Sequence, residues 1–181
     1  RFIYVTTPPQ VVAQTRNTDA IHQGVEATLS LDLTPWLLLP QPVESVSWRQ
    51  ALTWNDFRFD GDPVHGNNRL PMVPEFAYFS ALRVGLGERF HSELNVCSAF
   101  GDRPADNANS TSVASYVVWG LHFDYAHNEN TRLFLAVRNL TNTRRVESFA
   151  LTDVLPTIPG NDRIFNPLEP RAIQAGITIA F

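Results

Sequence analysis

Apolar and polar side chains alternate at every second position along most of the chain. In the segment 24–33 (GVEATLSLDL), one face carries only the apolar side chains of positions 25, 27, 29, 31 and 33. This period of two indicates a β-strand, because an amphipathic helix would repeat its apolar positions every three or four residues. The same alternation recurs in the segments 46–54, 75–85, 89–100, 113–125, 132–140 and 172–181. With the apolar segment 1–6, the pattern predicts about eight strands.

The predicted strands are long, and their connections alternate in length. Most strands run to about ten residues, which is the length that a tilted strand needs to cross a bilayer. Long polar connections lie at 6–20, 60–74 and 101–112, and short ones at 85–87 (GLG) and 127–131 (HNENT). Long loops at one end and short turns at the other are typical of outer-membrane β-barrels.

One connection does not follow this rule. The segment 34–44 (TPWLLLPQPVE) falls in the series of short turns, yet it is long and apolar, and the pattern gives no account of it. The alternation alone also leaves a soluble β-sandwich or barrel open, because the strands of such proteins alternate in the same way.

The amino-acid composition and net charge exclude further classes of protein. Of the 181 residues, 44% are apolar and 18% are charged, the latter below the usual quarter. The net charge of −4 gives no basic footprint, so nucleic acid is not an expected partner. No run of 18 apolar residues is present, so the chain offers no membrane-spanning helix.

Several motifs resemble those of TonB-dependent outer-membrane receptors, in the same order along the chain. In the segment Leu52–Val84 an aromatic-rich strand is followed by an acidic loop, a Gly-Asn pair, a Leu-Pro-x-Val-Pro sequence and the next strand. The family commonly has glycine where this chain has Met72. Later motifs are the segments 106–125 and Asn139-Leu140-Thr141-Asn142 and the terminal Phe181. The residues of the segment 55–62 (NDFRFDGD) most resemble those of siderophore-receptor-like members of this family.

The resemblance implies a fold and a location. The fold is all-β: an antiparallel transmembrane β-barrel segment of about eight strands, the last third of a barrel of about 22 strands. Residues 1–181 would be the C-terminal part of the barrel domain, with the plug domain and the TonB box outside this sequence. The expected location is the outer membrane, with its lipid as a partner. The extracellular loops would be 7–20, 60–74, 101–112 and 151–171.

The resemblance also implies partners. Phe181 would be the signal to the barrel assembly machinery, and TonB would act only through the missing N-terminal region. In the family, plug and loops hold the ligand, here expected to be a ferric siderophore. Candidate residues at the ligand rim are His65, Asn67, Arg69, Arg103, Asp106 and Arg163, whose arginines would attract an anionic chelate.

No residue set indicates covalent chemistry. The Gly-x-Ser-x-Gly motif of hydrolases is absent, and no enzyme activity, cofactor or metal site is expected. Asp56, Asp60 and Asp62 resemble part of a calcium loop without its closing glutamate, and a solvated turn is the alternative.

The leading prediction is a segment of a TonB-dependent receptor that imports a scarce ligand. The alternatives are a truncated, non-transporting remnant and a standalone small outer-membrane β-barrel.

Overall fold

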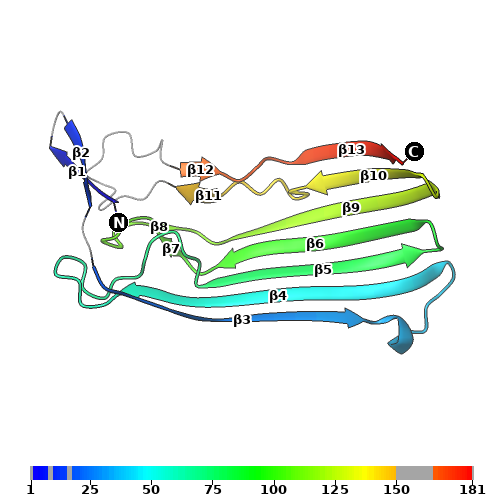
Figure 1. Cartoon of the computed structure of the whole chain (residues 1–181), viewed down its shortest axis with the longest axis horizontal. Coiled ribbons are helices and arrows are strands. Elements are labelled where there is room, and N and C mark those ends of the chain that lie inside the picture. Colours follow the sequence, from blue (N-terminus) through cyan, green and yellow to red (C-terminus); the bar gives the residue numbers. More distant parts are fainter. Residues whose placement is uncertain (1, 8–9, 16–17, 150–164, 181) are drawn as a thin grey trace.

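Seven antiparallel strands form one continuous sheet. Figure 1 shows them side by side in the computed structural model, which describes residues 2–7, 10–15, 18–149 and 165–180. The order across the sheet is β13-β10-β9-β6-β5-β4-β3. The strands are β3 (Ala20–Asp32), β4 (Val43–Phe59), β5 (Phe76–Leu86), β6 (Phe90–Phe100), β9 (Tyr116–Asn128), β10 (Thr131–Arg138) and β13 (Ala172–Ile179). Seven of the strands predicted from the alternation are thus confirmed.

Three small hairpins accompany this sheet. They are β1 (Phe2–Thr7) with β2 (Gln10–Thr15), β7 (Arg103–Pro104) with β8 (Ser112–Val113), and β11 (Val146–Phe149) with β12 (Phe165–Pro167). The strand predicted at 1–6 therefore pairs with β2, which lies within the predicted long loop, and it does not extend the main sheet. A 3₁₀ turn, η1 (Thr34–Trp36), lies between β3 and β4. No helix in the described part of the chain is long and apolar enough to cross a membrane.

The register places the predicted apolar positions on one face, which we call the outer face. One row of paired apolar residues crosses all seven strands: Leu31, Trp48, Leu82, Leu94, Leu121, Val137 and Ile173. Many of these side chains are exposed, among them Leu94 at 40% and Ile173 at 71%. An uncharged exposed band of this kind is what a barrel wall presents to lipid.

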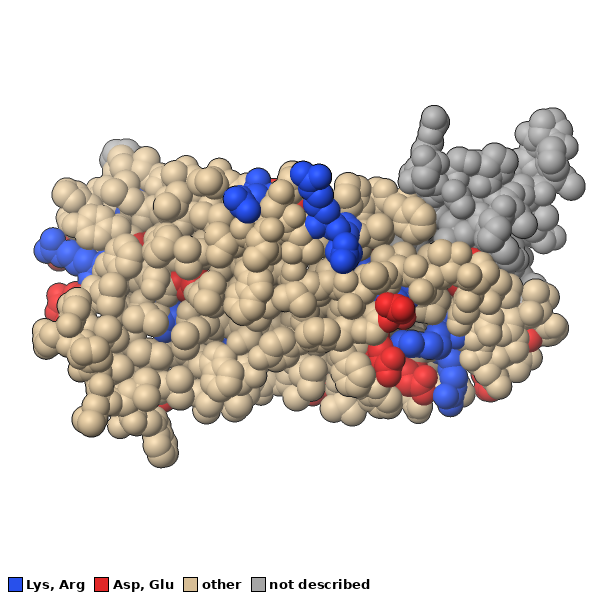
Figure 2. Space-filling view, turned by 180° about the vertical axis from the view of Figure 1, so that it is seen from behind, with Lys and Arg blue, Asp and Glu red and all other residues tan. Residues whose placement is uncertain are grey.

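Charge is nearly excluded from the outer face. Among its residues paired in the main sheet, Asp56 and Arg58 are the only Asp, Glu, Lys or Arg, and their side chains lie 3.1 Å apart near the end of β4. In Figure 2, which shows this face, the centre is tan, and red and blue gather toward the ends and the upper margin. The opposite, inner face carries polar and charged side chains, described below.

Aromatic rings mark both ends of the outer face. Trp54 pairs with Phe76, which pairs with Phe100, at the end where β4 and β6 finish. Phe90 pairs with Tyr125 at the other end. Rings at the two borders of an apolar band are typical of membrane-spanning barrels, because aromatic side chains favour the headgroup level.

The connections segregate as predicted. Figure 1 shows β1, β2, β7, β8, β11 and β12 at one end of the main sheet, which we call the loop end. The short connections β5–β6 and β9–β10 lie at the opposite end, the turn end, together with η1 and the C-terminus.

Gly176 shows how the inner face is packed. It pairs with Phe134 across the β10–β13 ladder, and a Cβ at position 176 would lie 2.4 Å from a carbon of that ring. Gly176→Val should force the ring aside and lower the free energy of unfolding by about 1–3 kcal/mol. Denaturant titration in lipid vesicles measures this change. The double variant Gly176→Val/Phe134→Ala should be less destabilised than the sum of the two single variants, and strict additivity would contradict the packing account.

Candidate functional site

Hydrogen bonds join several of the described segments at the loop end. The backbone N–H of Asp60 donates to the carbonyl of Asp19 (3.0 Å), so the segment before β3 is joined to the β4–β5 loop. The Thr18 hydroxyl donates to the Asp62 carboxylate and joins the same two segments. The N–H of Met72 donates to the carbonyl of Pro104 (3.2 Å), which joins the β4–β5 loop to the β6–β9 loop.

Asn109 is the main link between these two loops. Its side-chain oxygen accepts the N–H of Arg69 (3.0 Å), and its amide nitrogen donates to the Arg69 carbonyl (2.9 Å) and to the Asp106 carbonyl (3.1 Å). Its φ of 54° lies in the left-handed region, which asparagine tolerates better than most residues. One side chain therefore fixes the backbone at Arg69 relative to the β6–β9 loop.

Arg103 links the β6–β9 loop to β11. Only 4% of the residue is exposed. Its guanidinium donates to the carbonyls of Val146 (2.7 Å) and Glu147 (2.8 Å) and lies 5.3 Å from the ring centre of Tyr116. This buried guanidinium stabilises the arrangement of the loops, because it donates hydrogen bonds to backbone carbonyls and does not face solvent.

His65 and Asp106, two more of the predicted rim residues, are also buried, at 6% and 0% exposure. The His65 ring stacks on Phe59 with centroids 5.5 Å apart, and the backbone N–H of His65 donates to the Asp62 carboxylate (2.9 Å). The Asp106 carboxylate accepts the N–H of Ser110 (2.8 Å) and its hydroxyl. Both side chains thus hold the loops in place.

Asn67 and Arg69 are the predicted rim residues that remain accessible. Asn67 is exposed and Arg69 is half-buried. The Arg69 guanidinium lies 3.2 Å from the Glu75 carboxylate, with 38% of its side chain exposed. The Asn67 side-chain oxygen accepts the N–H of Gly61 (2.9 Å). The bonded loop cluster therefore contains the five predicted rim residues that the structure describes: His65, Asn67, Arg69, Arg103 and Asp106. Arg163 and Phe181 lie outside the described residues.

The inner face carries a second group of polar side chains. Arg49 and Glu93 form an ion pair across β4 and β6 (3.0 Å). His122 contacts Asp124 (3.1 Å) and stacks on the ring of Phe134. His91 also lies on the inner face, since it pairs with Asp124, as His122 does with Glu93.

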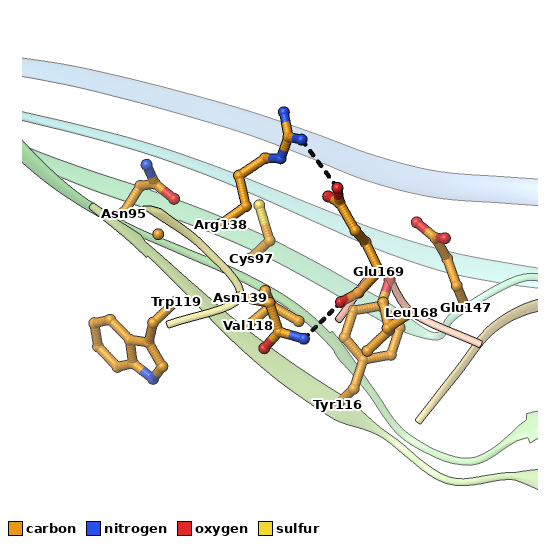
Figure 3. Close-up of a pocket in the computed structure, with 11 residues that line it drawn as sticks. Asn95, Cys97, Tyr116, Val118, Trp119, Arg138, Asn139, Glu147, Leu168 and Glu169 are labelled. Carbon is orange, nitrogen blue, oxygen red and sulfur yellow. Dashed lines mark hydrogen bonds and ion pairs between the residues drawn. The ribbon is translucent and has the colours of Figure 1, made fainter. Parts of the chain in front are cut away.

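A pocket of about 270 Å³ lies on the inner face below the loop cluster. Figure 3 shows Arg138 and Glu169 directed toward each other (2.9 Å), with Trp119 pointing away from them. The Asn139 amide donates to the Glu169 carbonyl (2.7 Å), and Asn95 and Cys97 also line the pocket. Arg138 and Glu169 thus form an ion pair at a pocket that Val118 and Leu168 also line.

Sequence reasoning did not single out Arg138, Glu169 or Asn109. Arg138 had a usable signal, since the alternation along β10 puts it on the inner face opposite the apolar Val137. Glu169 and Asn109 lie in irregular segments, whose bonds no periodicity predicts. Among the described residues, no group of three or more His, Cys, Asp or Glu side chains is arranged to hold a metal ion.

Comparison with known proteins identifies the fold. The sequence profile of the family described as "TonB dependent receptor-like, beta-barrel" matches residues 2–140. Among curated proteins, sequence comparison gave no match.

Solved structures give the same answer. The chain resembles the siderophore receptor PiuA from Acinetobacter baumannii (TM-score 0.65, 17% identity, 88% of this chain and 22% of that one). It also resembles the ferric yersiniabactin uptake receptor FyuA from Yersinia pestis (TM-score 0.69, 19% identity, 90% and 24%) and the copper transporter OprC (TM-score 0.70, 16% identity, 100% and 26%). The chain thus spans 22–26% of the length of these three structures. Since the family profile covers most of the chain, the chain belongs to the TonB-dependent receptor-like β-barrel family and is a protein of the outer membrane.

Proposed function

We propose that residues 1–181 are the C-terminal part of the barrel domain of a TonB-dependent receptor that imports a ferric siderophore. In this proposal the seven-stranded sheet is membrane wall, and the loop end faces the cell exterior. The remaining strands and the plug belong to polypeptide outside this sequence. The energy comes from the TonB complex, which acts on that other part. The chain itself performs no covalent chemistry and needs no cofactor.

One observation carries this proposal: the sheet has a nearly uncharged outer face and a polar inner face, and long, bonded loops lie at one of its ends. Its edge strands β3 and β13 have unpaired backbone groups within the described sheet. Such edges are costly in lipid, so further strands must complete the wall. Of the structures compared above, PiuA is a siderophore receptor and FyuA a ferric yersiniabactin uptake receptor by name, which favours a ferric chelate as the ligand.

The loop geometry supports a division of roles among the predicted rim residues. Asn67 and Arg69 are accessible, and we assign them to contact with ligand, together with Arg163. His65, Arg103 and Asp106 act as positioning residues, because they are buried and bonded within the loops. Phe181 would be read by the barrel assembly machinery, and the outer face would contact membrane lipid.

The experiment that tests this function is an uptake assay. The gene is deleted and restored in cells starved of iron, and uptake of ferric hydroxamate, catecholate and carboxylate chelates is compared with uptake of copper(II) alone. The proposal predicts that one class of ferric chelate enters only with the gene present and only in cells with active TonB. Uptake of copper alone, for which the likeness to OprC is a reason to test, would contradict the siderophore assignment.

Arg69→Gln should weaken binding of that chelate. The guanidinium is partly exposed, so its loss is expected to cost about 0.2–1 kcal/mol, which corresponds to an increase in Kd of up to about fivefold. Equilibrium binding to purified receptor measures the change, and it should shrink as the salt concentration rises. Arg89→Gln, the same substitution near the turn end, is the matched control. Equal increases in Kd for the two variants would contradict the assignment of Arg69 to the ligand rim.

A further inference from the structure

The connection between β3 and β4 exposes large apolar side chains. Trp36 is 83% exposed, Leu37 47% and Leu38 103%. The segment 33–42 (LTPWLLLPQP) contains no charged residue. A single exposed leucine is ordinary, but a contiguous apolar projection marks a surface that contacts another phase or molecule.

Backbone and side-chain hydrogen bonds hold the base of this projection in place. The N–H of Leu33 donates to the Val46 carbonyl (2.8 Å), and the N–H of Trp36 donates to the Leu33 carbonyl (3.0 Å). The Thr34 hydroxyl accepts the N–H of Val46 (3.0 Å), and the Asp32 carboxylate accepts the N–H of Thr34 (3.0 Å). The base of the loop is thereby fixed to β4.

The far side of the loop is fixed as well. The N–H of Val43 donates to the Pro40 carbonyl (2.9 Å), and the N–H of Gly87 donates to the Pro42 carbonyl (3.0 Å). Prolines at 35, 40 and 42 restrict the backbone between these bonds. The loop therefore presents Trp36 and Leu38 outward and does not bury them against the described sheet.

The loop continues the membrane-facing surface at the turn end. Leu29 and Leu31, on the outer face of β3, lead directly into it and are 48% and 36% exposed. Figure 1 places η1 beyond the end of β3, and in Figure 2 an uncharged projection stands at the corresponding lower left. The other two connections at this end, 87–89 and 129–130, are short and polar.

We propose that this loop is a lipid anchor, which inserts Trp36 and Leu38 into the membrane leaflet at the turn end of the barrel. Tryptophan suits the headgroup level, because its ring is apolar and its N–H is polar. Leucine side chains beside it gain from contact with acyl chains. The expected depth is shallow, about 5–10 Å into the boundary between headgroups and acyl chains. The occupant is thus phospholipid, and the short polar turns of the same end stay in water.

A spin-label experiment tests the proposal. The receptor as the cell produces it is prepared in a Cys97→Ser background with Leu38→Cys or, as the matched control, Asn130→Cys in the β9–β10 turn. Both positions are exposed and lie at the same end. Each nitroxide-labelled protein is reconstituted into phosphatidylcholine vesicles. Collisions of the label are then measured with oxygen, which concentrates in the bilayer, and with a nickel chelate, which stays in water on both sides.

The lipid anchor predicts that the ratio of oxygen to nickel collisions is several-fold higher at position 38 than at position 130. An equal ratio at the two positions would mean that the loop projects into water and would overturn the proposal. Low collision with both reagents at position 38 would show that protein covers the loop, which would overturn it as well. Neither result depends on the identity of the imported ligand.

Discussion

Leu29→Arg is expected to destabilise the membrane-inserted protein by about 2–4 kcal/mol. Leu29 is 48% exposed on the outer face, where it pairs with Gln50 of β4. An arginine there would have to hold its charge in the hydrocarbon layer or distort the membrane to reach water. The free energy of unfolding from lipid vesicles, obtained by denaturant titration, measures the loss.

The matched control is Thr28→Arg. Thr28 is the preceding residue of β3 and is also exposed, but the pleat directs it to the inner face. The same charge introduced there should change the free energy of unfolding by less than about 1 kcal/mol, because it meets water or polar groups. Equal losses for the two variants would contradict the assignment of the outer face to lipid.

Asn139→Ala is expected to lower the free energy of unfolding by about 2–5 kcal/mol. Asn139 is 3% exposed and has a φ of 48°. Its amide donates to the carbonyls of Thr143 (3.0 Å) and Glu169 (2.7 Å), and its side-chain oxygen accepts the N–H of Thr143 (2.8 Å). Loss of these bonds costs about 1–3 kcal/mol, and alanine in the left-handed region adds about 1–2 kcal/mol. Thermal and denaturant unfolding both report the change.

Asn139→Gly separates the two causes. Glycine accepts the positive φ but cannot form the side-chain bonds, so this variant should be more stable than Asn139→Ala by about 1–2 kcal/mol. If the two variants were equally stable, backbone strain would have no part in the effect. If both matched the unsubstituted protein, the proposed link between β10 and the segment before β13 would be wrong.

The segment 139–142 (Asn-Leu-Thr-Asn) could be recognised in the sequence, but its structural role could not be predicted. It was recognised by resemblance alone. The structure supplies its physical reason, since Asn139 and Asn142 both have positive φ. Asn142 accepts the N–H of Arg171 (3.1 Å), so both asparagines fasten the chain beyond β10 to the segment that enters β13. Such bonds join residues about 30 positions apart, and no local pattern reveals them.

The strands of the main sheet were predictable because one physical constraint acts on every second residue. Each apolar position in the row from Leu31 to Ile173 must face the same environment, so the alternation encodes both the strands and their faces. The first segment was predicted from a short apolar run, and that pattern is local and does not specify the partner strand. Its pairing with β2, in place of β3, was therefore not foreseen.

The loop cluster was only partly predictable. Loop length and residue type indicated Asn67 and Arg69 as loop residues, and the structure leaves Asn67 exposed and Arg69 half-buried. The same reasoning grouped them with His65, Arg103 and Asp106, which the structure buries. A charged residue in a polar loop looks solvated in sequence, and its burial depends on carbonyls such as those of Val146 and Glu147, which come from another loop.

The orientation of the sheet in the outer membrane is the central claim, and cysteine labelling on intact cells tests it most directly. In a Cys97→Ser background, Val64→Cys lies in the β4–β5 loop, where Val64 is 61% exposed, and Asn130→Cys lies in the β9–β10 turn. Each strain is treated with a maleimide too large to cross the outer membrane, before and after the membrane is made permeable. The account predicts that position 64 is labelled on intact cells and that position 130 is labelled only after permeabilisation. Labelling of position 130 on intact cells, with position 64 protected, would contradict it.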